Sequence, residues 1–460
     1  MKRIYTLFSI IFLATLSLNA QEANDCSVNL SLEHDYIKSR RYEEAFPYWE
    51  KVYKACPDSN EAIYSDGIKI YKNRLKEAVK AKDEVKSKEI VNTIVSLYDD
   101  WAKYFPQSKY IGKIYQDKGL VLLRNKMASK EELYNIFSEG YAKGPEKFTS
   151  PTAIYAYFDA TVDMYKNKKV DFEKLIEVYD ALTGTIDTSI EKYTKKMEAL
   201  QKKEEAGELM KKEARKLKAI KKNIPVYSVV AGEMDKILGE LGDCTHLVPL
   251  YKKNYEANKD NATWLKKAAN NLSKKDCSND PIFKTLVIQL DRIKPTYKSK
   301  YFLGILFEKE GQKAKAIAYY KEAISLSEKS YDKAKIYYNL ATMAKRAGQK
   351  SAARSYARQA LANRPSMGSA YLLIAKLYAG SVNDCGNDRF TKLSAYWLAA
   401  QMADKAAKVD PSKAKVAKQM AKRYRSLAPS KEDIFIGTHP AGSKIPMKCW
   451  IGGSVTVPGK

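Results

Sequence analysis

The spacing Ala-x3-Ala-x2-Ala-x4-Pro recurs in this chain and constrains its fold more than any other feature. Steps of four and three residues place three small side chains on one stripe of a helix, and the following proline ends that helix. Two copies are complete: Ala353, Ala357, Ala360 and Pro365, and Ala399, Ala403, Ala406 and Pro411. Two more keep the stripe with larger residues or without the proline: Ala45, Trp49, Val52 and Pro57, and Ala316, Tyr320 and Ala323. The recurrence predicts repeated helical units and excludes most enzyme folds.

A second small residue lies twelve positions before two of these stripes, at Gly304 and at Ala341. Each unit is therefore predicted to be a hairpin of two helices. Gly304 and Ala341 are 37 residues apart, and the next such residue, Ala375, follows after 34. A pair of antiparallel helices with a period of ~34 residues resembles the tetratricopeptide repeat (TPR).

The resemblance implies an all-α fold, a right-handed α-solenoid of TPR-like helical hairpins. It is good over 297–411 and fair over 29–58, where Glu33 stands at a position expected to be small. The segment 59–187 contains helix-length amphipathic stretches, which we interpret as degenerate hairpins of the same solenoid.

The N-terminus has the pattern of a secretory signal peptide. Lys2 and Arg3 precede an apolar run that ends at Leu18, and Ala20 offers a small residue at the cleavage point. The run is shorter than the ~20 residues of a membrane-spanning helix, and no later segment approaches that length. The sequence therefore predicts export, to the periplasm or in association with the outer membrane, with no transmembrane span in the mature protein. Cys26 lies too far beyond the predicted cut to favour a lipid anchor.

The six cysteines of an exported chain suggest disulfides, although the sequence allows 15 full pairings. Two pairs flank predicted hairpins at similar separations, 30 and 33 residues. The remaining pair would form the single long-range link, and buried free thiols are the alternative. The predicted pairs are Cys26 with Cys56, Cys244 with Cys277, and Cys385 with Cys449.

An insertion and a changed pattern mark the C-terminal end. Ala375 and Ala399 are 24 residues apart instead of 12, and the inserted segment 380–389 is rich in Gly, Asn and Asp, which predicts a loop rather than a helix. Beyond Pro429 the chain is expected to form two short strands, 434–437 and 449–457, around a Gly-Ser turn. A bridge from this β-hairpin-like tail to the inserted loop would cover the last repeats. The chain resembles exported bacterial TPR proteins with a cysteine-containing tail, and that resemblance implies no shared reaction.

A long run of Lys, Glu and Ala separates the two repeat regions. We interpret it as a solvated helix held by Glu and Lys pairs at i and i+4, and a projecting helix that docks a partner is the alternative. The predicted organisation is a signal peptide (1–20), N-terminal TPR-like hairpins (21–187), a long charged helical segment (188–242), a cysteine-flanked hairpin (243–294), a C-terminal TPR array (295–426) and a C-terminal β tail (427–460).

The chain carries a formal charge of +27, which becomes +25 without Lys2 and Arg3. Nucleic acid is not the expected partner, because the chain is predicted to be exported and lacks a zinc-finger, homeodomain or RNA-recognition signature. A positive field would concentrate acidic protein segments or anionic envelope polymers. Dispersed lysines that only keep a long solenoid soluble are the alternative.

No catalytic or metal-binding motif is present. The three histidines, His34, His246 and His439, are far apart in sequence, and no paired-ligand, phosphate-loop or nucleophile-elbow pattern occurs. The sequence therefore predicts a protein that is not an enzyme and has no cofactor and no metal.

In the TPR family the first helix of each hairpin lines a concave surface, and the resemblance assigns six residues to it. Tyrosines offer a flat apolar surface and lysines attract carboxylates. The lysine, asparagine and arginine pattern with which some members hold chaperone tails is not reproduced, and packing between helices is the alternative role for the two tyrosines. The predicted ligand-binding residues are Lys298, Tyr301, Lys335, Tyr338, Asn339 and Lys376.

The prediction is thus an exported scaffold that binds protein partners of the cell envelope, or peptide segments, through its concave surface. The second hypothesis is a cationic surface-binding protein that is held on cell-wall polymer or anionic lipid by its charge.

Overall fold

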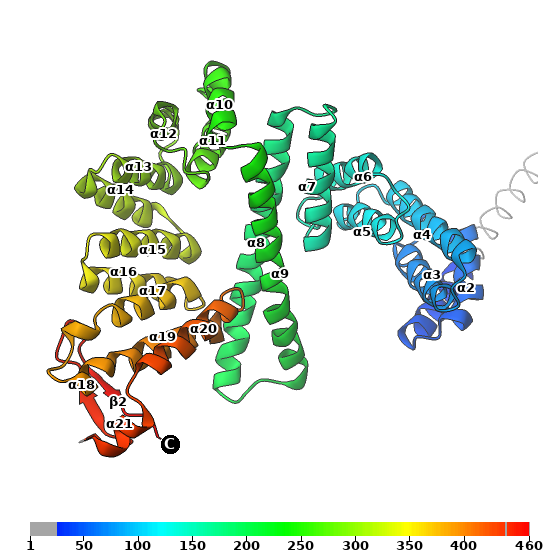
Figure 1. Ribbon diagram of the computed structural model, residues 1–460. Helices are drawn as coiled ribbons and strands as arrows, with labels where there is room; N and C mark the ends of the chain where they lie inside the picture. The colour runs from blue at the N-terminus through cyan, green and yellow to red at the C-terminus, as the bar shows by residue number, and fades with distance from the viewer. Residues whose placement is uncertain (1–24, 438, 460) are drawn as a thin grey trace, which may run out of the picture. The chain divides into compact units, whose positions relative to one another are not determined.

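The computed structural model describes residues 25–437 and 439–459, and the predicted signal peptide lies outside them. The chain forms two compact units that divide between Ile186 and Asp187. Most of the described chain is helical, with one two-stranded sheet near the C-terminus (Figure 1). The predicted all-α solenoid with a short β tail is confirmed.

The first unit is a series of antiparallel helices in which each packs against the next. A helix over residues 25–38 is followed by α2 (Tyr42–Ala55), α3 (Ala62–Lys80), α4 (Glu84–Tyr104), α5 (Ile111–Arg124), α6 (Lys130–Lys143), α7 (Pro151–Lys166) and the start of α8 (Phe172–Glu205). Within this series α3 packs against α4, and α5 packs against α6.

The second unit contains the rest of α8 and all later elements. They are α9 (Lys211–Leu241), α10 (Cys244–Asn258), α11 (Ala262–Lys274), α12 (Pro281–Ile293), α13 (Tyr297–Lys309), α14 (Lys313–Leu326), α15 (Ser330–Arg346), α16 (Lys350–Asn363), α17 (Gly368–Ala379), η1 (Val382–Asp384), α18 (Arg389–Leu393), α19 (Ala395–Val409), α20 (Ala414–Leu427), α21 (Lys431–Ile436), β1 (Lys444–Pro446) and β2 (Ser454–Thr456). The helices α13 to α17, together with α19 and α20, form the hairpin array drawn from yellow-green to orange in Figure 1.

The stripes read from the sequence form the contact surface inside each hairpin. All six alanines of the two complete copies are fully buried, and so are Ala316, Tyr320 and Ala323. The two helices of a hairpin approach closely because a small residue faces a large one. A Cβ atom added to Gly304 would lie 2.5 Å from the Tyr320 ring of the same hairpin. Successive hairpins meet in the same way, since a Cβ atom on Gly67 of α3 would lie 2.6 Å from the Trp49 indole of α2. Larger residues at these glycines would force the helices apart.

A left-handed residue recurs in the turns inside the hairpins. In the array this residue is Gly311 or Gly348, with φ of 75° and 72°. In the first unit, residues with side chains take the same conformation, with φ between 55° and 62°: Arg40, Lys82, Lys126 and Lys168. The shared turn conformation shows that the first unit repeats the same hairpin, although its sequence lacks the glycine signal.

The predicted charged segment is a pair of long helices. The helix α8 runs without a break across residue 187, and its second half packs on α9 through a small apolar core built from Met197, Leu217, Ile220 and Ile224. Ion pairs cross between the helices, including Lys203 with Glu213 at 2.6 Å. This core explains why the segment is not a single solvated helix.

The C-terminal tail differs from its predicted strand positions. The segment expected to start the first strand forms helix α21, because Ser430 and Asp433 make reciprocal capping hydrogen bonds. The strands are β1 and β2, paired antiparallel with Ile445 opposite Val455. A similar reciprocal cap at Asp388 starts the short helix α18, so the inserted segment ends in a helical turn where only a loop was expected.

The tail is held on the array by buried apolar side chains and by a hydrogen bond from Trp450. Ile445, Val455 and Val457 are at most 1% exposed and belong to the same core as α17 and α19. The Trp450 indole nitrogen donates to the Ser381 hydroxyl at 2.9 Å. The tail therefore covers the inserted loop and the neighbouring helices.

Three cysteine pairs lie at bonding distance, and they are the pairs expected from the sequence. Their Cα atoms are 6.4 Å apart for Cys26 and Cys56, 5.5 Å for Cys244 and Cys277, and 5.0 Å for Cys385 and Cys449. Over the described residues, none of the helices combines the length and the apolar character needed to cross a membrane.

Candidate ligand-binding site

Four of the six predicted ligand-binding residues lie together on α13 and α15. The Asn339 amide donates to the Tyr301 hydroxyl at 2.9 Å, and the Lys298 ammonium lies 5.7 Å from the centre of the Tyr301 ring. Lys335 is near enough to Lys298 to lower its pKa. This group therefore forms one polar and aromatic cluster on the first helices of two successive hairpins.

The other two predicted residues have different surroundings. Tyr338 is half-buried and packs into the apolar contacts between α15, α16 and α17, which supports a packing role for it. Lys376 is exposed on α17, and none of the contacts recorded for the cluster over the described residues includes it. The structure thus brings four of the six residues together.

The electrostatics of the cluster reflect limited access of water. Burial lowers the pKa of Lys298, the nearby Lys335 lowers it further, and Asp332 and Asp187 oppose the change. Burial also raises the pKa of Tyr301 above its ordinary value. The Lys335 ammonium lies 4.0 Å from the Asp187 carboxylate of α8. The cluster is therefore partly enclosed by the chain itself.

The second half of α8 runs along the ends of the array helices and contacts them at several points. The Glu198 carboxylate accepts a hydrogen bond from the Ser366 amide at 3.2 Å, and Glu205 pairs with Lys408 at 3.1 Å. The second half of α8 therefore covers part of the edge of the array near the start of α17 and the end of α19. The ligand-binding role of the six residues remains a prediction.

A more open hollow lies in the first unit, where no site was predicted. Its volume is about 470 Å³, and it lies between one face of α3 and one face of α5, with part of α4 as its floor. The lining residues are spaced by three and four along each helix, as one helical face requires. They include Ser65, Lys69 and Lys72 from α3, Tyr98 and Trp101 from α4, and Tyr110, Lys113, Ile114 and Asp117 from α5 or its start.

The polar groups of this α3–α5 hollow are held in place. Lys69 pairs at 2.5 Å with the buried Asp66, and Lys113 pairs with Asp117 one turn along α5. The Lys72 ammonium donates to the Tyr98 hydroxyl at 3.1 Å, and burial lowers the pKa of Lys72. Three ammonium groups thus border one hollow.

The indole of Trp101 is fixed at the edge of the floor. Its nitrogen donates at 2.8 Å to the Glu61 carboxylate, which also accepts from the Ser108 hydroxyl at 2.5 Å. Aromatic rings offer a flat apolar surface, and ammonium groups attract carboxylates. The hollow can therefore hold an extended segment that carries apolar and acidic side chains.

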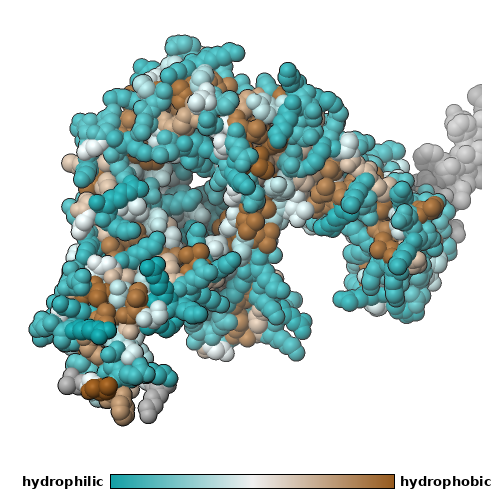
Figure 2. All heavy atoms as spheres, viewed as in Figure 1, coloured by the Kyte–Doolittle hydropathy of each residue, from teal (hydrophilic) through white to brown (hydrophobic). Residues whose placement is uncertain are grey.

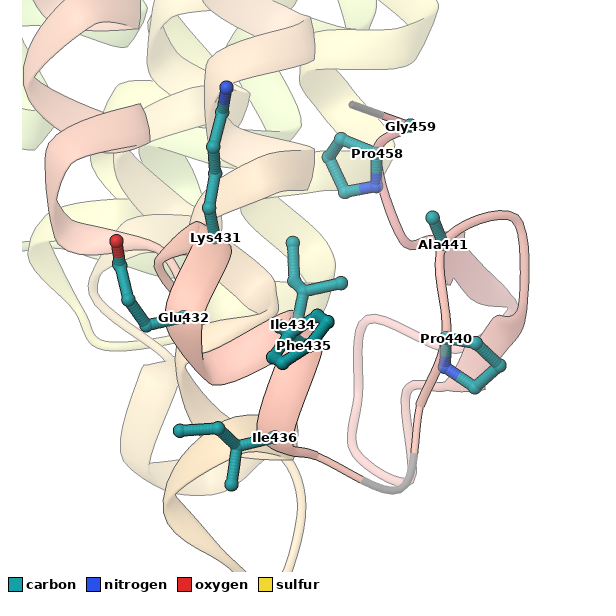
Figure 3. A pocket seen from close by; sticks show the side chains of 9 residues that line it. All are labelled: Lys431, Glu432, Ile434, Phe435, Ile436, Pro440, Ala441, Pro458 and Gly459. Atoms are coloured by element: carbon teal, nitrogen blue, oxygen red, sulfur yellow. The ribbon is translucent and has the colours of Figure 1, made fainter.

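A third hollow, in the tail, is mostly apolar. Figure 3 shows Ile434 and Phe435 on the side of α21 that faces Pro440, Ala441 and Pro458, around a volume of about 580 Å³. Phe435 is 88% exposed and Ile436 is 83% exposed. In Figure 2, hydrophobic side chains are visible over this tail at the lower left.

The histidines do not form a catalytic arrangement. His34 contacts Asp66 at 2.8 Å, His246 contacts Asp243 at 3.0 Å on an exposed turn, and the His439 ring stacks on Phe390 at 5.4 Å. Among the described residues, no three side chains of the types that bind metals converge on one point.

The helical hairpins define this chain as an α-helical repeat protein. No family model matches the sequence, and no curated protein is similar to it. Among solved structures, yeast Tom70 aligns with 12% identity and a TM-score of 0.29, over 89% of this chain and 97% of that chain. Two monomeric mutants of IFIT1, with Gppp-AAAA and with m7Gppp-AAAA, align with 14% and 13% identity and TM-scores of 0.31 and 0.32, each over 70% of this chain and 69% of that chain.

Proposed function

We propose that this protein is an exported, non-catalytic scaffold that binds protein partners or peptide segments through its first-helix surfaces. The observation that carries the proposal is the α3–α5 hollow, in which an aromatic floor lies between two first helices that present three lysines. The partners that suit this chemistry are extended segments with acidic side chains, such as those of cell-envelope proteins. The four-residue cluster on α13 and α15 is the second surface in this proposal.

Export is part of the proposal and has its own support. Three cysteine pairs at bonding distance suit an oxidising compartment, in which disulfides persist. The periplasm, or the periplasmic face of the outer membrane, is the compartment that we propose.

The α3–α5 hollow can be tested with two substitutions in residues whose side chains are exposed. Tyr110→Ala together with Lys113→Glu should weaken the binding of a fluorescent acidic peptide at least tenfold, because the variant loses an apolar surface and reverses one charge. The matched control is Tyr104→Ala with Lys109→Glu, which changes the same residue types outside the lining of the hollow. Fluorescence anisotropy of both variants measures the effect.

The result also distinguishes the two first-helix surfaces. A loss of binding with Lys335→Glu, and not with the Tyr110 and Lys113 variant, would move the binding site to α13 and α15. Equal binding by all variants would reject first-helix recognition of acidic segments.

The alternative function is surface binding by charge alone, and the net charge of +27 favours it. In that case, binding to anionic vesicles or cell-wall polymer should collapse as the salt concentration rises, because the screening length shortens to ~3 Å at 1 M. Peptide binding to an aromatic floor should keep much of its affinity under the same conditions.

A further inference from the structure

A small polar cavity lies inside the second unit, between the α8–α9 pair and the ends of the array helices. Its volume is about 190 Å³. One side is formed by α8 and α9, including Thr194 and Ser228, and the other by the loops that follow α16 and α19. The two loops occupy the same place in successive repeats. In each of them a charged residue is followed by proline and serine, as Arg364-Pro-Ser366 in one and Asp410-Pro-Ser412 in the other.

Two donors in the wall of this cavity have no hydrogen-bond partner in the described chain. Ser366 is 2% exposed, and its hydroxyl oxygen is buried and unpartnered. The Nε of Arg364 is also buried without an acceptor. An unsatisfied buried donor costs about 1 to 3 kcal/mol, so such groups are normally met by water, an ion or a ligand.

The charge around the cavity is positive on the side of the array. The Arg364 guanidinium lies 4.4 Å from the centre of the Tyr331 ring, and the Lys335 ammonium lies 4.9 Å from the same ring. Two cations therefore share one aromatic ring beside the cavity, and Lys335 also pairs with Asp187 of α8 at 4.0 Å.

The acidic groups nearby are already occupied. The Asp410 carboxylate accepts from the Gly368 amide at 3.2 Å, and from the Ser412 amide at 3.0 Å and hydroxyl at 2.6 Å. Glu198 accepts from the Ser366 amide at 3.2 Å. Their oxygens are turned to these donors, which leaves the free donors of Arg364 and Ser366 for another acceptor.

We propose that this cavity is a binding site for a small tetrahedral oxyanion such as phosphate or sulfate. Guanidinium and hydroxyl donors match the acceptor oxygens of such an anion, and charge-assisted hydrogen bonds are the strong ones. The volume admits an anion with a few waters and is smaller than the ~300 Å³ of ordinary ligand pockets. The bound anion joins the α8–α9 pair to the array. This inference does not rest on peptide binding in the α3–α5 hollow, because the cavity and that hollow belong to different units.

The test is a calorimetric titration of the full chain with sodium phosphate, at an ionic strength held constant with sodium chloride. One phosphate should bind per chain. Arg364→Gln and Ser366→Ala should each weaken binding, by about tenfold or more for the arginine, which contributes a charged donor. The matched control is Arg358→Gln, which removes the same charge from an exposed position on α16, the helix that precedes the Arg364 loop, and it should bind phosphate like the intact protein.

Several results would overturn the site. Absence of saturable binding would mean that the cavity holds only water, and equal weakening by Arg358→Gln would mean general attraction to a basic protein. If Arg364→Gln fails to fold, Ser366→Ala decides the question, because it removes only an unpartnered hydroxyl. Titration with glycerol phosphate shows whether the site takes a free phosphate ion or a phosphate group that belongs to a larger molecule. Binding of phosphate alone indicates a free ion, and binding of both indicates a phosphate group on a larger molecule.

Discussion

Glu33 occupies the position at which the first hairpin is expected to have a small side chain, and the structure buries it completely. Neither of its carboxylate oxygens has a hydrogen-bond partner in the described chain. Burial, and to a smaller extent the nearby Asp66 carboxylate, raise the pKa of Glu33 to about 8, although Lys69 opposes the change. The neighbouring Asp66 is buried too, but His34 and Lys69 pair with it. Glu33 is therefore held in its neutral form near pH 7.

The first prediction follows from this raised pKa. Below about pH 4.5 Glu33 is protonated in both states and its contribution to stability is complete. Between about 4.5 and 8 the folded state keeps the proton that the unfolded state loses, so the free energy of unfolding falls as pH rises. Glu33→Gln removes this loss and should raise the free energy of unfolding by about 1 to 3 kcal/mol at pH 8, with little effect at pH 4.5.

Urea unfolding of the intact chain and the variant at both pH values measures the difference. Glu44→Gln, at an exposed position on α2, is the control and should show no such gain at pH 8. A gain from Glu33→Gln of the same size at pH 4.5 and pH 8 would contradict the buried, protonated carboxyl.

At the scale of the element, the hairpin turn explains why the sequence pattern is clear in the array and weak in the first unit. The array uses glycine at the left-handed position, as at Gly311 and Gly348, and the first unit uses lysine or arginine there. A side chain in this conformation costs about 1 to 2 kcal/mol, so sequence alone gives no reason to expect a lysine at such a turn.

The same cost gives a second prediction. Lys82→Gly and Lys126→Gly should each raise the free energy of unfolding by about 0.5 to 1 kcal/mol, because glycine relieves the left-handed strain and only part of that gain is lost to a more flexible unfolded chain. Lys80→Gly, in the last turn of α3, should lower it by up to about 1 kcal/mol. Urea midpoints at constant slope measure these changes. Destabilisation by all three would mean that the loops carry no strain.

Other elements show what pattern reading captured and what it did not. The buried alanine stripes were predicted residue by residue, because a period of three and four is a local property of one helix. The sequence predicts a strand where α21 forms, because Ile434, Phe435 and Ile436 are good strand formers. The reciprocal cap between Ser430 and Asp433 starts a helix there instead.

The candidate site was harder to predict than the fold, because a site depends on contacts between elements. Trp101 and Tyr110 belong to different helices with no shared spacing, so only the hairpin packing shows that they line one hollow. The approach of α8 to Lys335, across almost 150 residues of sequence, is likewise a tertiary contact. The signal that could have identified the α3–α5 hollow was the spacing of Ser65, Lys69 and Lys72 on one face of α3.

At the scale of the whole molecule, the repeat array depends on its ends, since each hairpin buries its apolar face only against a neighbour. The tail supplies buried side chains at this end, including Ile445, Val455 and Val457. The Cys385–Cys449 pair closes a segment with a sequence separation of 64 residues, for which chain-entropy reasoning gives up to ~4 kcal/mol of stabilisation.

The last prediction is that the tail acts by covering the array. Deleting 430–460, or replacing Cys449→Ser, should lower the melting temperature and expose the chain from Ser366 onward to protease, because buried apolar surface becomes accessible. The matched control is Phe435→Ser with Ile436→Ser, which changes tail side chains that are more than four-fifths exposed and should leave the melting temperature unchanged.

Melting curves and limited proteolysis of these variants distinguish a covering role of the tail from a docking role. A deletion variant that melts like the intact protein but no longer captures partners would instead identify the tail as a docking element, and a loss of capture by the Phe435 and Ile436 variant alone would place that docking on α21.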